Sequence, residues 1–316
     1  MPDAPQLTVC MPASRDTPLF RQALRSALDQ DVEGLEVIVS DDSGGGLEVA
    51  IREVGDERVH HIAQRERLGF ARNHTTVLDA ARGEFIAMLH DDDRWLDGYL
   101  ATAIRHLRAE PDLGMVCSDV WLEWEDGTFR RRRDRPAAGR YDRWLSTVMA
   151  HNVFIPSATV MRREVWDRVR REWPDVVIGD VVLWIDAARA GIPMRWVDEP
   201  LVVYRMHSGQ VSADQRRHRD AGVTVFGGYV FPEDERAERL RRSRVAHYLI
   251  GRAGLRMREG QVAEARDDLA EAARISPGRQ RSRRLVLSGL AGQPWLLPAA
   301  ARARRIVRGQ RARLDG

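Results

Sequence analysis

The chain contains no lysine and only two cysteines, and the shortage of cysteine excludes the disulfide-rich classes of secreted domain. Cys10 and Cys117 both lie in apolar runs typical of strands, so we interpret them as reduced core residues, which suits a cytoplasmic protein. All 50 basic residues are arginine, and the formal net charge is only +3. This balance indicates no particular partner for the chain as a whole.

Long hydrophobic runs are also missing. No apolar segment approaches the roughly 20 residues that cross a membrane. Met1–Ala4 leads almost directly into a predicted strand, so we expect no signal peptide. We therefore expect a cytoplasmic protein, with any contact to the plasma membrane peripheral and at its inner face. A chain of 316 residues has room for one large domain or two ordinary ones.

Three consecutive carboxylates follow a short buried strand and form the centre of the first half of the chain. The run Phe85–Leu89 is continuously apolar, which is typical of a strand buried on both faces, and Asp91, Asp92 and Asp93 come just after it. Three acids at one strand end repel one another, and the usual compensator is a divalent cation whose coordination shell a substrate phosphate completes. A solvated acidic turn is the alternative that the triplet alone leaves open.

Strands and helices alternate along this half of the chain. Before the Phe85 run we predict strands at residues 7–11, 35–39 and 59–63 and helices at 18–28 and 69–81, with Pro12 stopping the first strand. Such alternation predicts an α/β fold with a mostly parallel sheet flanked by helices. Polar residues follow the first, second and fourth strands. Because parallel strands end at one edge of the sheet, these residues should converge on one ligand site.

An ordered set of short motifs gives the chain a resemblance to a known family. The set is Pro12, Ser26, Gln30, Asp41-Asp42-Ser43, Ala71-Arg72-Asn73, Gly83-Glu84-Phe85, Asp92 to Trp95, Gly179 to Trp184 and Pro200 to His207. Over residues 6–212 the chain thus resembles the inverting family 2 glycosyltransferases, which have the GT-A fold. The resemblance implies attack of an acceptor hydroxyl on the anomeric carbon of a nucleotide-diphosphate sugar, with a UDP-sugar favoured and Mg²⁺ or Mn²⁺ stabilising the departing diphosphate.

The resemblance also implies a biological setting and a set of donor contacts. The setting is synthesis of cell-surface polysaccharide or a related glycoconjugate, with a glycan, a lipid-linked sugar or a peptide as acceptor. Pro12 would border the nucleotide, Asp42 would bond the base, Asp91 would face the ribose, and Arg72 and Arg205 would hold the diphosphate. From the residues alone, Asp42 could equally be a turn or capping aspartate and Arg72 a solvated helix residue.

The same resemblance implies which residues bind the metal and which residue is the general base. Asp92 would bind the metal, with Asp93 close by and His207 as a further ligand, although His207 alone would pass for an ordinary surface residue. Asp180 would be the general base, at the start of a helix that opens with the apolar residues Val181–Ile185. A carboxylate is favoured at any helix start, so a purely capping role is the alternative. Asp93 is the competing candidate for the base.

Two departures from the family pattern bear on specificity. Ala13, Ser14 and Arg15 stand where the family often has threonine, an aromatic residue and asparagine, so an aromatic ring for stacking on the base is missing. Uridine specificity is therefore open. Gly179 replaces a glutamate before Asp180, which alters how the acceptor is held.

The segment between the donor motifs and Asp180 should face the acceptor. A hairpin turn is predicted at Asp126-Gly127, followed by Arg130–Arg135, which holds five arginines. This run is either a solvated loop or a grip for an anionic acceptor. The segment with His151, Asn152 and Ser157 is similar to segments that line the acceptor cleft in the family.

The last third of the chain has a helical pattern. We predict a GT-A domain over residues 1–215, a connector over 216–232 and an all-α module over 233–316. Tyr248–Pro277 resembles one tetratricopeptide helix pair. A single repeat cannot bury its own face, so it must pack on neighbouring helices, on the catalytic domain or on a second subunit in a homodimer.

The tail after Gly278 has ten arginines and one acid, beside the apolar residues 295–297. It suits contact with an anionic membrane surface, while nucleic acid or plain solvation is open from the composition alone. No nucleic-acid partner is expected for the protein.

Two other functions compete with sugar transfer. A nucleotidyltransferase would share the α/β sheet, but it normally has a glycine-rich phosphate loop after the first strand, where this chain has Pro12–Arg15. A non-catalytic scaffold with a degenerate sheet domain is the second. The presence of Asp42, Asp92, Asp180 and His207 together argues against such decay.

Overall fold

The computed structural model describes residues 5–132, 135–150, 154–210 and 214–278. The chain divides into two compact units, Met1–Ala213 and Asp214–Gly316. The strands of the first unit are β1 (Leu7–Ala13), β2 (Leu35–Asp41), β3 (Val59–Ala63), β4 (Phe85–Met88), β5 (Arg94–Trp95), β6 (Met115–Trp124), β7 (Phe129–Arg131), β8 (Gly139–Tyr141), β9 (Thr159–Arg162) and β10 (Met194–Met206). Its helices are α1 (Pro18–Leu28), α2 (Glu48–Val54), α3 (Gly69–Ala80), α4 (Tyr99–Ala109), α5 (Leu145–Ala150), the 3-10 turn η1 (Pro156–Ala158), α6 (Arg163–Val169) and α7 (Val181–Arg189).

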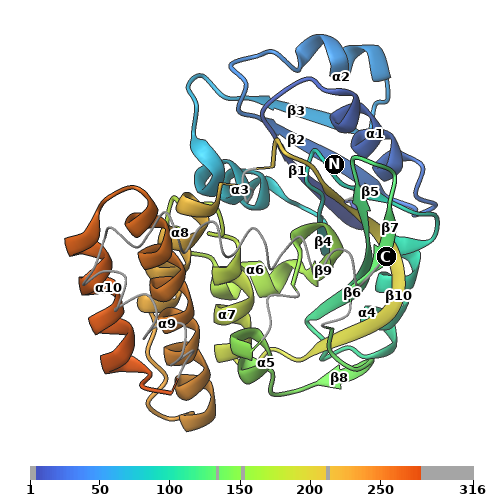
Figure 1. The fold of residues 1–316 in the computed structure, drawn as a ribbon. Coiled ribbons are helices and arrows are strands. Elements are labelled where there is room, and N and C mark those ends of the chain that lie inside the picture. The colour runs from blue at the N-terminus through green and yellow to red at the C-terminus, as the bar shows by residue number, and fades with distance from the viewer. Residues whose placement is uncertain (1–4, 133–134, 151–153, 211–213, 279–316) are drawn as a thin grey trace. The chain divides into compact units, whose positions relative to one another are not determined.

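One mixed sheet organises the first unit (Figure 1). Its strand order is β3-β2-β1-β4-β9-β6-β10-β5, with β7 beside β6 and β8 beside β10. The first four strands in this order are mutually parallel, and β10 is parallel to β6. In contrast, β9 runs antiparallel between β4 and β6. The predicted α/β fold, a mostly parallel sheet flanked by helices, is confirmed.

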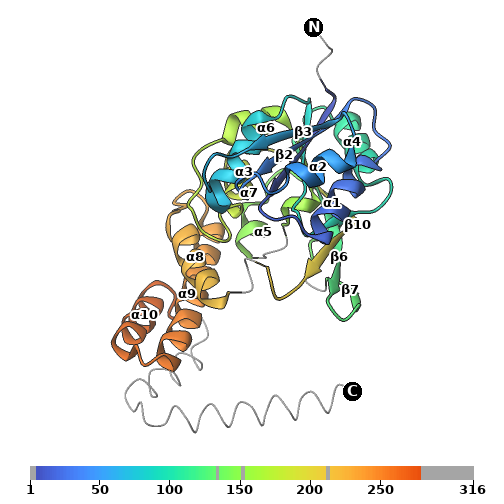
Figure 2. The same ribbon diagram turned by 90° about the horizontal axis from the view of Figure 1, so that it is seen from above.

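The side chains of β1 alternate between the two faces of the sheet. Leu7, Val9 and Met11 form a core with apolar residues of α1 and α4. On the opposite face, the Cys10 thiol donates a hydrogen bond to the carbonyl oxygen of Val77 in α3 over 3.3 Å. Both cysteines are free and buried, as predicted. Helices therefore cover both faces of the sheet, as Figure 2 shows.

The first strand runs two residues further than predicted. Pro12 lies within β1, opposite Ser40 of β2, although proline cannot donate to a sheet ladder. It is tolerated because β4, the neighbour on the other side, pairs with β1 only as far as Cys10. The prediction that Pro12 stops the strand is therefore wrong, and the strand ends at Ala13.

Two motif residues, Ser26 in α1 and Gln30 just after it, bond to the segment that follows the acid triplet. The Ser26 hydroxyl accepts a hydrogen bond from the Trp95 amide over 3.1 Å. The Gln30 side chain accepts from the Leu100 amide (3.1 Å) and donates to the Leu96 carbonyl oxygen (3.0 Å). These bonds explain why serine and glutamine at these positions belong with the Asp92–Trp95 motif.

The second unit contains α8 (Gln215–Gly227), α9 (Glu235–Arg258) and α10 (Val262–Ile275). The predicted connector over residues 216–232 is therefore largely helix. It packs on α9, since Phe226 stacks on Tyr248 with ring centroids 5.7 Å apart. Gly222 permits this contact, because a Cβ there would overlap the Tyr248 ring. The segment belongs with the helical unit because its apolar residues are buried there, a feature that its arginine-rich sequence obscures.

Helices α9 and α10 form a pair joined by a short turn. Buried Asp268 of α10 pairs with Arg252 (2.7 Å) and Arg256 (2.8 Å) of α9. The likeness of this pair to a tetratricopeptide repeat stays a prediction. The basic tail lies outside the described residues from position 279 onward.

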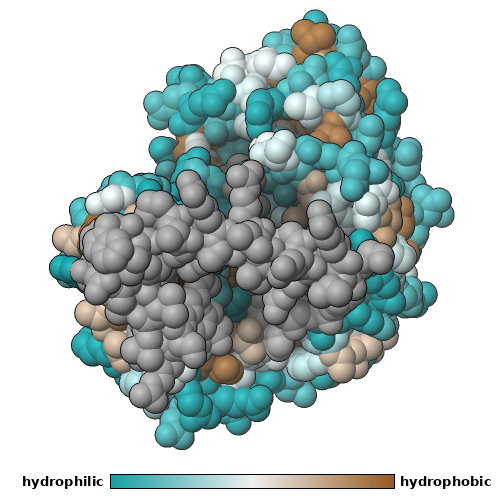
Figure 3. Space-filling model, in the orientation of Figure 1, coloured by the Kyte–Doolittle hydropathy of each residue, from teal (hydrophilic) through white to brown (hydrophobic). Residues whose placement is uncertain are grey.

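None of the helices in the described part of the chain combines the length and the apolar content needed to cross a bilayer. The face seen in Figure 3 is mainly hydrophilic over α1 and α2, with hydrophobic residues scattered among polar ones. Among the described residues, the exposed large hydrophobic side chains are Val49, Phe129 and Val230. They lie on different elements, and single exposed residues of this kind are ordinary on protein surfaces.

Candidate active site

The ends of β1, β2 and β4 meet at one edge of the sheet, as predicted. Ala13 at the end of β1 is in register with Asp41 at the end of β2, and β4 is parallel to β1. The Ser14 amide donates to Asp91 Oδ2 over 3.2 Å, so the residue after β1 contacts the turn after β4. The predicted donor residues Pro12 and Asp91 therefore lie at the same edge.

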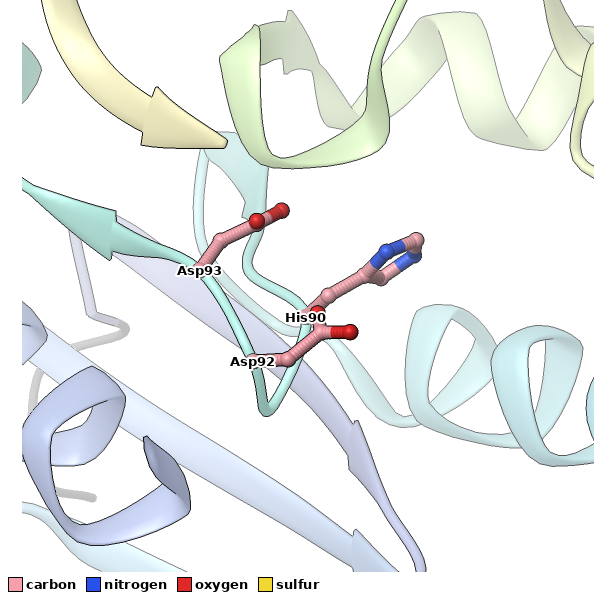
Figure 4. Close-up of side chains that lie close together, drawn as sticks. All are labelled: His90, Asp92 and Asp93. Carbon is pink, nitrogen blue, oxygen red and sulfur yellow. The ribbon is translucent and has the colours of Figure 1, made fainter. Parts of the chain in front are cut away.

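Residues 89–93, the acid turn, connect β4 to β5 and carry His90, Asp92 and Asp93 (Figure 4). Asp93 is completely buried. It accepts hydrogen bonds from the Ser157 hydroxyl (2.5 Å) and from the Arg205 amide (3.0 Å). Burial and the neighbouring Asp92 raise the pKa of Asp93 well above its ordinary value. With both oxygens bonded inside the protein, Asp93 anchors the turn and is poorly placed to act as a base.

Asp92 is more accessible, and its Oδ2 lies 3.1 Å from His207 Nε2. Burial acts to raise the pKa of Asp92, but the hydrogen bond with His207 and the charges of nearby imidazoles lower it overall. The same hydrogen bond raises the pKa of His207. Two predicted ligands of one ion thus lie side by side.

The donor set around the turn fits a divalent cation. His90, Asp92 and Asp93 each offer a ligand atom, and these atoms lie within 4.8 Å of one another. Carboxylate oxygens suit Mg²⁺ and Mn²⁺, and an imidazole nitrogen is compatible with Mn²⁺ and later transition metals. His90 was missing from the predicted ligands, although its position directly before the triplet is a usable signal.

The charge of Asp91 is controlled by its surroundings. Burial and the neighbouring Asp92 raise the pKa of Asp91 to about 6, and the hydrogen bond from the Ser14 amide offsets part of this rise. Asp91 is therefore largely ionised at neutral pH. It can accept hydrogen bonds from hydroxyl groups such as those of a ribose.

Asp42 holds the start of α3. Its Oδ1 accepts from the Leu68 amide (2.5 Å) and its Oδ2 from the Gly69 amide (3.1 Å). Asp42 therefore caps α3 through amides that lie 26 and 27 residues later in the chain, whereas the alternative predicted from the sequence was a local cap or turn before the glycines. Each oxygen still has a lone pair for a further donor. Arg72, in the first turn of the same helix, is exposed and pairs with no acid among the described residues.

Asn73, from the Ala71-Arg72-Asn73 motif, ties α3 to two strand ends. Its side-chain amide donates to the carbonyl oxygens of Ser40 (3.2 Å) and Ala13 (3.4 Å), and its oxygen accepts from the Ser40 hydroxyl (2.6 Å). The motif therefore sets the position of Arg72 relative to the strand ends.

Arg205 is not placed as the motif pattern predicts. A role in holding the diphosphate needs a guanidinium directed at the ligand, but Arg205 is only 7% exposed. Its donors reach Glu123 (3.2 Å), the Asp92 carbonyl oxygen (3.1 Å) and Gln22 (2.6 Å). Because these acceptors belong to the protein, we correct the assignment. Arg205 supports the acid turn.

Asp180 precedes α7, and its side chain makes no capping hydrogen bond. It is 9% exposed, and burial raises its pKa to about 7, against a smaller opposing effect of nearby backbone amides. A base works best when its pKa lies near the operating pH. The environment of Asp180 therefore suits proton transfer better than helix capping.

Gly179 has a packing reason in this chain. A Cβ at this position would lie 2.7 Å from the Pro174 carbonyl oxygen and 3.8 Å from Ala71 Cβ in α3. The loop before α7 therefore lies against the first turn of α3, where Arg72 is. A glutamate at position 179 would not fit this path.

Buried His74 and half-buried His90 form a pair that the motif pattern did not predict. Their Nε2 atoms are 2.9 Å apart, and His74 Nδ1 is 2.7 Å from the Phe70 carbonyl oxygen. Burial lowers the pKa of His74 to about 3, so this ring is neutral. In the sequence, His74 is one residue on the buried face of the predicted helix. Nothing in the pattern indicates that it contacts the acid turn.

The arginine run after the hairpin is only partly available to an acceptor. Arg131 pairs with buried Asp119 (2.6 Å) and with Asp198 (2.8 Å), and Arg135 pairs with Asp198 (3.0 Å). These two arginines fasten the hairpin to the body of the domain, whereas Arg130 is exposed. Residues 133–134 and 151–153, which include His151 and Asn152, lie outside the described residues.

A pocket of about 480 Å³ opens beside His207. Its lining comes from the β6–β7 hairpin, from the end of β10 and from the residues just after it, and consists of Trp124, Glu125, Asp126, Met206, His207, Ser208 and Gln210. This volume lies in the range that small ligands occupy.

Ser157 supports the acid turn rather than lining an acceptor cleft. Its hydroxyl accepts from the His90 amide (3.1 Å) and donates to Asp93.

We expect Ser157→Ala to lower the free energy of unfolding by about 1–3 kcal/mol, because it leaves buried groups unbonded. Urea unfolding measures this loss. Ser208→Ala, which removes an exposed hydroxyl, should change stability by no more than about 0.5 kcal/mol, and equal losses in the two variants would contradict the assigned role.

The family model described as Glycosyl transferase family 2 matches residues 8–170. The chain belongs to this family. The match spans the four parallel strands, the acid turn and Ser157, so the predicted family is confirmed. Because the family consists of glycosyltransferases, the nucleotidyltransferase alternative is set aside.

One curated relative is the GalNAc(5)-diNAcBac-PP-undecaprenol beta-1,3-glucosyltransferase of Campylobacter jejuni. It is 33% identical over 105 residues, which are 32% of this chain and 34% of the relative. The chain spans only 34% to 55% of the length of several curated relatives.

Two solved structures share the fold of this chain. S. aureus TarS 1–349 in complex with UDP-GlcNAc has a TM-score of 0.64 at 15% identity, over 92% of this chain and 88% of that one. Mannosyltransferase PcManGT from Pyrobaculum calidifontis, in complex with GDP-Man and Mn²⁺, has a TM-score of 0.56 at 20% identity, over 95% and 83%. The predicted GT-A fold is thereby confirmed.

Proposed function

We propose that the protein is a metal-dependent inverting glycosyltransferase, which moves a sugar from a nucleotide-diphosphate donor to an acceptor hydroxyl. The observation that carries this proposal is the acid turn. In a family 2 chain it brings potential ligand atoms of His90 and Asp92 within 4.8 Å of each other and of the buried Asp93 carboxyl, and Asp92 lies 3.1 Å from His207. We assign metal binding to Asp92, His207 and His90, with Asp93 as their anchor.

The chain's own residues divide the chemistry between donor and acceptor. A bound Mg²⁺ or Mn²⁺ would stabilise negative charge on the departing diphosphate as a Lewis acid. In this proposal Asp42 and Asp91, at the ends of β2 and β4, bind the base and the ribose, and Pro12 borders the nucleotide. Arg72 adds a positive charge at the start of α3, where the helix dipole also favours an anion.

Asp180 is the proposed general base. With a pKa of about 7 it is substantially ionised at neutral pH and can take the proton of the attacking hydroxyl. Asp93 is a weaker candidate because Ser157 and Arg205 occupy its oxygens. Attack by the hydroxyl on the face opposite the diphosphate inverts the anomeric centre.

We infer a lipid-linked glycan as the acceptor class and cell-surface polysaccharide synthesis as the setting. Support comes from the Campylobacter jejuni relative, whose name specifies an undecaprenol-linked substrate. For the donor, a UDP-sugar is our first choice, and the TarS complex gives a precedent within the fold. GDP-mannose is a second candidate because of the PcManGT complex.

A panel of nucleotide sugars tests the function. The purified protein is incubated with each donor and Mn²⁺, and mass spectrometry follows release of the nucleoside diphosphate. We expect turnover of one donor class, and faster turnover when undecaprenol-linked acceptors are added. Binding of nucleotides without turnover of any donor or acceptor would favour the non-catalytic scaffold.

The helical unit is not expected to supply a catalytic group. All residues of the proposed site, from Pro12 to His207, precede Asp214, where the second unit begins. A chain ending at Ala213 should therefore hydrolyse donor at a rate within a few-fold of the full chain. Circular dichroism establishes that the shortened chain is folded. A folded chain without hydrolysis would show that the helices complete the site.

A further inference from the structure

The contact between His74 and His90 links the interior of α3 to the acid turn. His74 is 4% exposed, and its ring packs on Phe70, with ring centroids 4.1 Å apart, and near Trp173. His90 is half-buried at the end of β4. No step of the proposed reaction uses His74, and ordinary packing does not require two imidazoles with their Nε2 atoms 2.9 Å apart.

The hydrogen bonds determine which nitrogen carries each proton. The Phe70 carbonyl oxygen can only accept, so His74 Nδ1 must carry a hydrogen. Among the described residues no carboxylate bonds to His74, so this buried ring is neutral and its Nε2 has only a lone pair. His90 must therefore donate from Nε2 to His74. Because a neutral imidazole has one N–H, Nδ1 of His90 has a free lone pair.

This arrangement matches the way in which proteins prepare a histidine for metal binding. A ligating histidine usually donates its second ring nitrogen to an acceptor, which fixes both the tautomer and the orientation of the ring. Here the acceptor is a second imidazole, held in turn by a backbone carbonyl. Among the described residues, none forms a hydrogen bond with His90 Nδ1.

We propose that His74 is a positioning residue that holds His90 with Nδ1 available to the catalytic metal, so that the ion is bound through an imidazole nitrogen beside Asp92. This inference rests on the proposed metal-dependent function and specifies the ligand chemistry of that site. Nitrogen ligation disfavours Mg²⁺, which prefers oxygen ligands, relative to transition metals. The site should therefore bind Mn²⁺, and Co²⁺ more strongly still, in preference to Mg²⁺.

Pulsed electron paramagnetic resonance of Mn²⁺ bound with UDP, and separately with GDP, tests the ligand directly. A coordinated imidazole gives a ¹⁴N modulation of the Mn²⁺ signal. His207 is also a proposed ligand, so the comparison uses the His207→Gln background. We expect the modulation to persist in His207→Gln and to disappear when His90→Asp is added. His90→Asp alone should lower the ratio of Mn²⁺ to Mg²⁺ affinity by about tenfold.

Variants of His74 test the positioning role. His74→Phe keeps an aromatic ring against Phe70 but cannot accept from His90, so it should weaken Mn²⁺ binding by about 10- to 100-fold. His74→Gln has both an acceptor and a donor and should restore most of the affinity. His60→Phe, an exposed histidine on β3, serves as the control and should leave Mn²⁺ affinity unchanged. If His74→Phe does not fold, the comparison of His74→Gln with His74→Leu replaces it.

The outcomes separate this inference from the proposed function. Mn²⁺ that binds with nucleotide but shows no ¹⁴N modulation in His207→Gln would overturn the role of His90 and leave metal dependence intact. Equal Mn²⁺ affinity in wild type and in a folded His74 variant that cannot accept would overturn the role of His74. If Mn²⁺ has no effect on nucleotide binding by the wild type, the proposed function fails, and this inference fails with it.

Discussion

Replacing Asp180 by asparagine is expected to lower the rate of transfer to acceptor by about 10²- to 10⁴-fold, the usual contribution of a general base. Asparagine has nearly the same size but cannot take a proton at neutral pH. Nucleotide affinity should barely change, because the proposed donor contacts are made by Asp42, Arg72 and Asp92 and not by Asp180. Turnover and calorimetric titration on the same variant measure the two quantities.

The same variant should be more stable than the wild type above neutral pH. The pKa of Asp180 is raised from 3.8 to about 7 in the folded protein, so the carboxyl costs stability once the unfolded chain ionises. This cost grows as pH rises from about 4 and is complete above pH 7. Asp180→Asn removes it, and we expect a gain on the order of 1–4 kcal/mol at pH 8. A capping role predicts the opposite sign, a loss of about 0.5–2 kcal/mol.

The pH profile adds a third test of Asp180. The base must be ionised to work, so kcat/KM of the wild type should increase with pH, reach half its maximum near pH 7 and level off about one pH unit higher. The residual activity of Asp180→Asn should not show this increase. A stable variant with wild-type turnover and an unchanged profile would exclude Asp180 as the base and return attention to Asp93.

Replacing Asp92 by alanine should lower the affinity for a nucleoside diphosphate in the presence of Mn²⁺ by at least about 10- to 100-fold. Removing a residue that only supports a metal ligand typically lowers metal affinity by this factor. Removing a ligand itself should lower the affinity by at least as much. Without metal the affinity should be low in both proteins. Calorimetry with UDP and GDP, with and without Mn²⁺, measures the difference.

Asp97→Ala is the matched control for Asp92→Ala. Asp97 is an exposed aspartate just beyond β5, outside the acid turn. Its replacement by alanine removes one negative charge from the same region. Its variant should keep the effect of Mn²⁺ on nucleotide affinity. Equal behaviour of the two variants would mean that Asp92 contributes only general charge, and the metal assignment would be wrong.

The sheet was predictable because its strands obey a local rule. The parallel strands β1, β2 and β4 are buried on both faces, so each reads as a short apolar run, and polar residues begin where the run ends. The position of the site at their C-terminal edge then follows from the parallel arrangement. Neither inference depends on contacts between distant residues.

The supporting residues were not predictable in this way. Ser157 and Arg205 bond to Asp93 from positions 64 and 112 residues away, and the direction of the Arg205 guanidinium depends on acceptors from three other segments. The motif pattern predicted a diphosphate contact for Arg205, whereas the guanidinium bonds groups of the protein beside the acid turn. His74 lies on a helix face whose sequence pattern is typical of an ordinary hydrophobic core. Its contact with His90 depends on the tertiary fold and could not be predicted from the local sequence.

The most direct test of the central claim is the dependence of donor turnover on metal. Release of nucleoside diphosphate from the donor identified by the panel is measured with Mn²⁺, after chelation with EDTA, and after Mn²⁺ is restored in excess. The acid turn predicts turnover that falls to background on chelation and recovers with the metal, in the wild type but not in Asp92→Ala. Turnover that is unaffected by chelation, or that Asp92→Ala retains, would contradict the account.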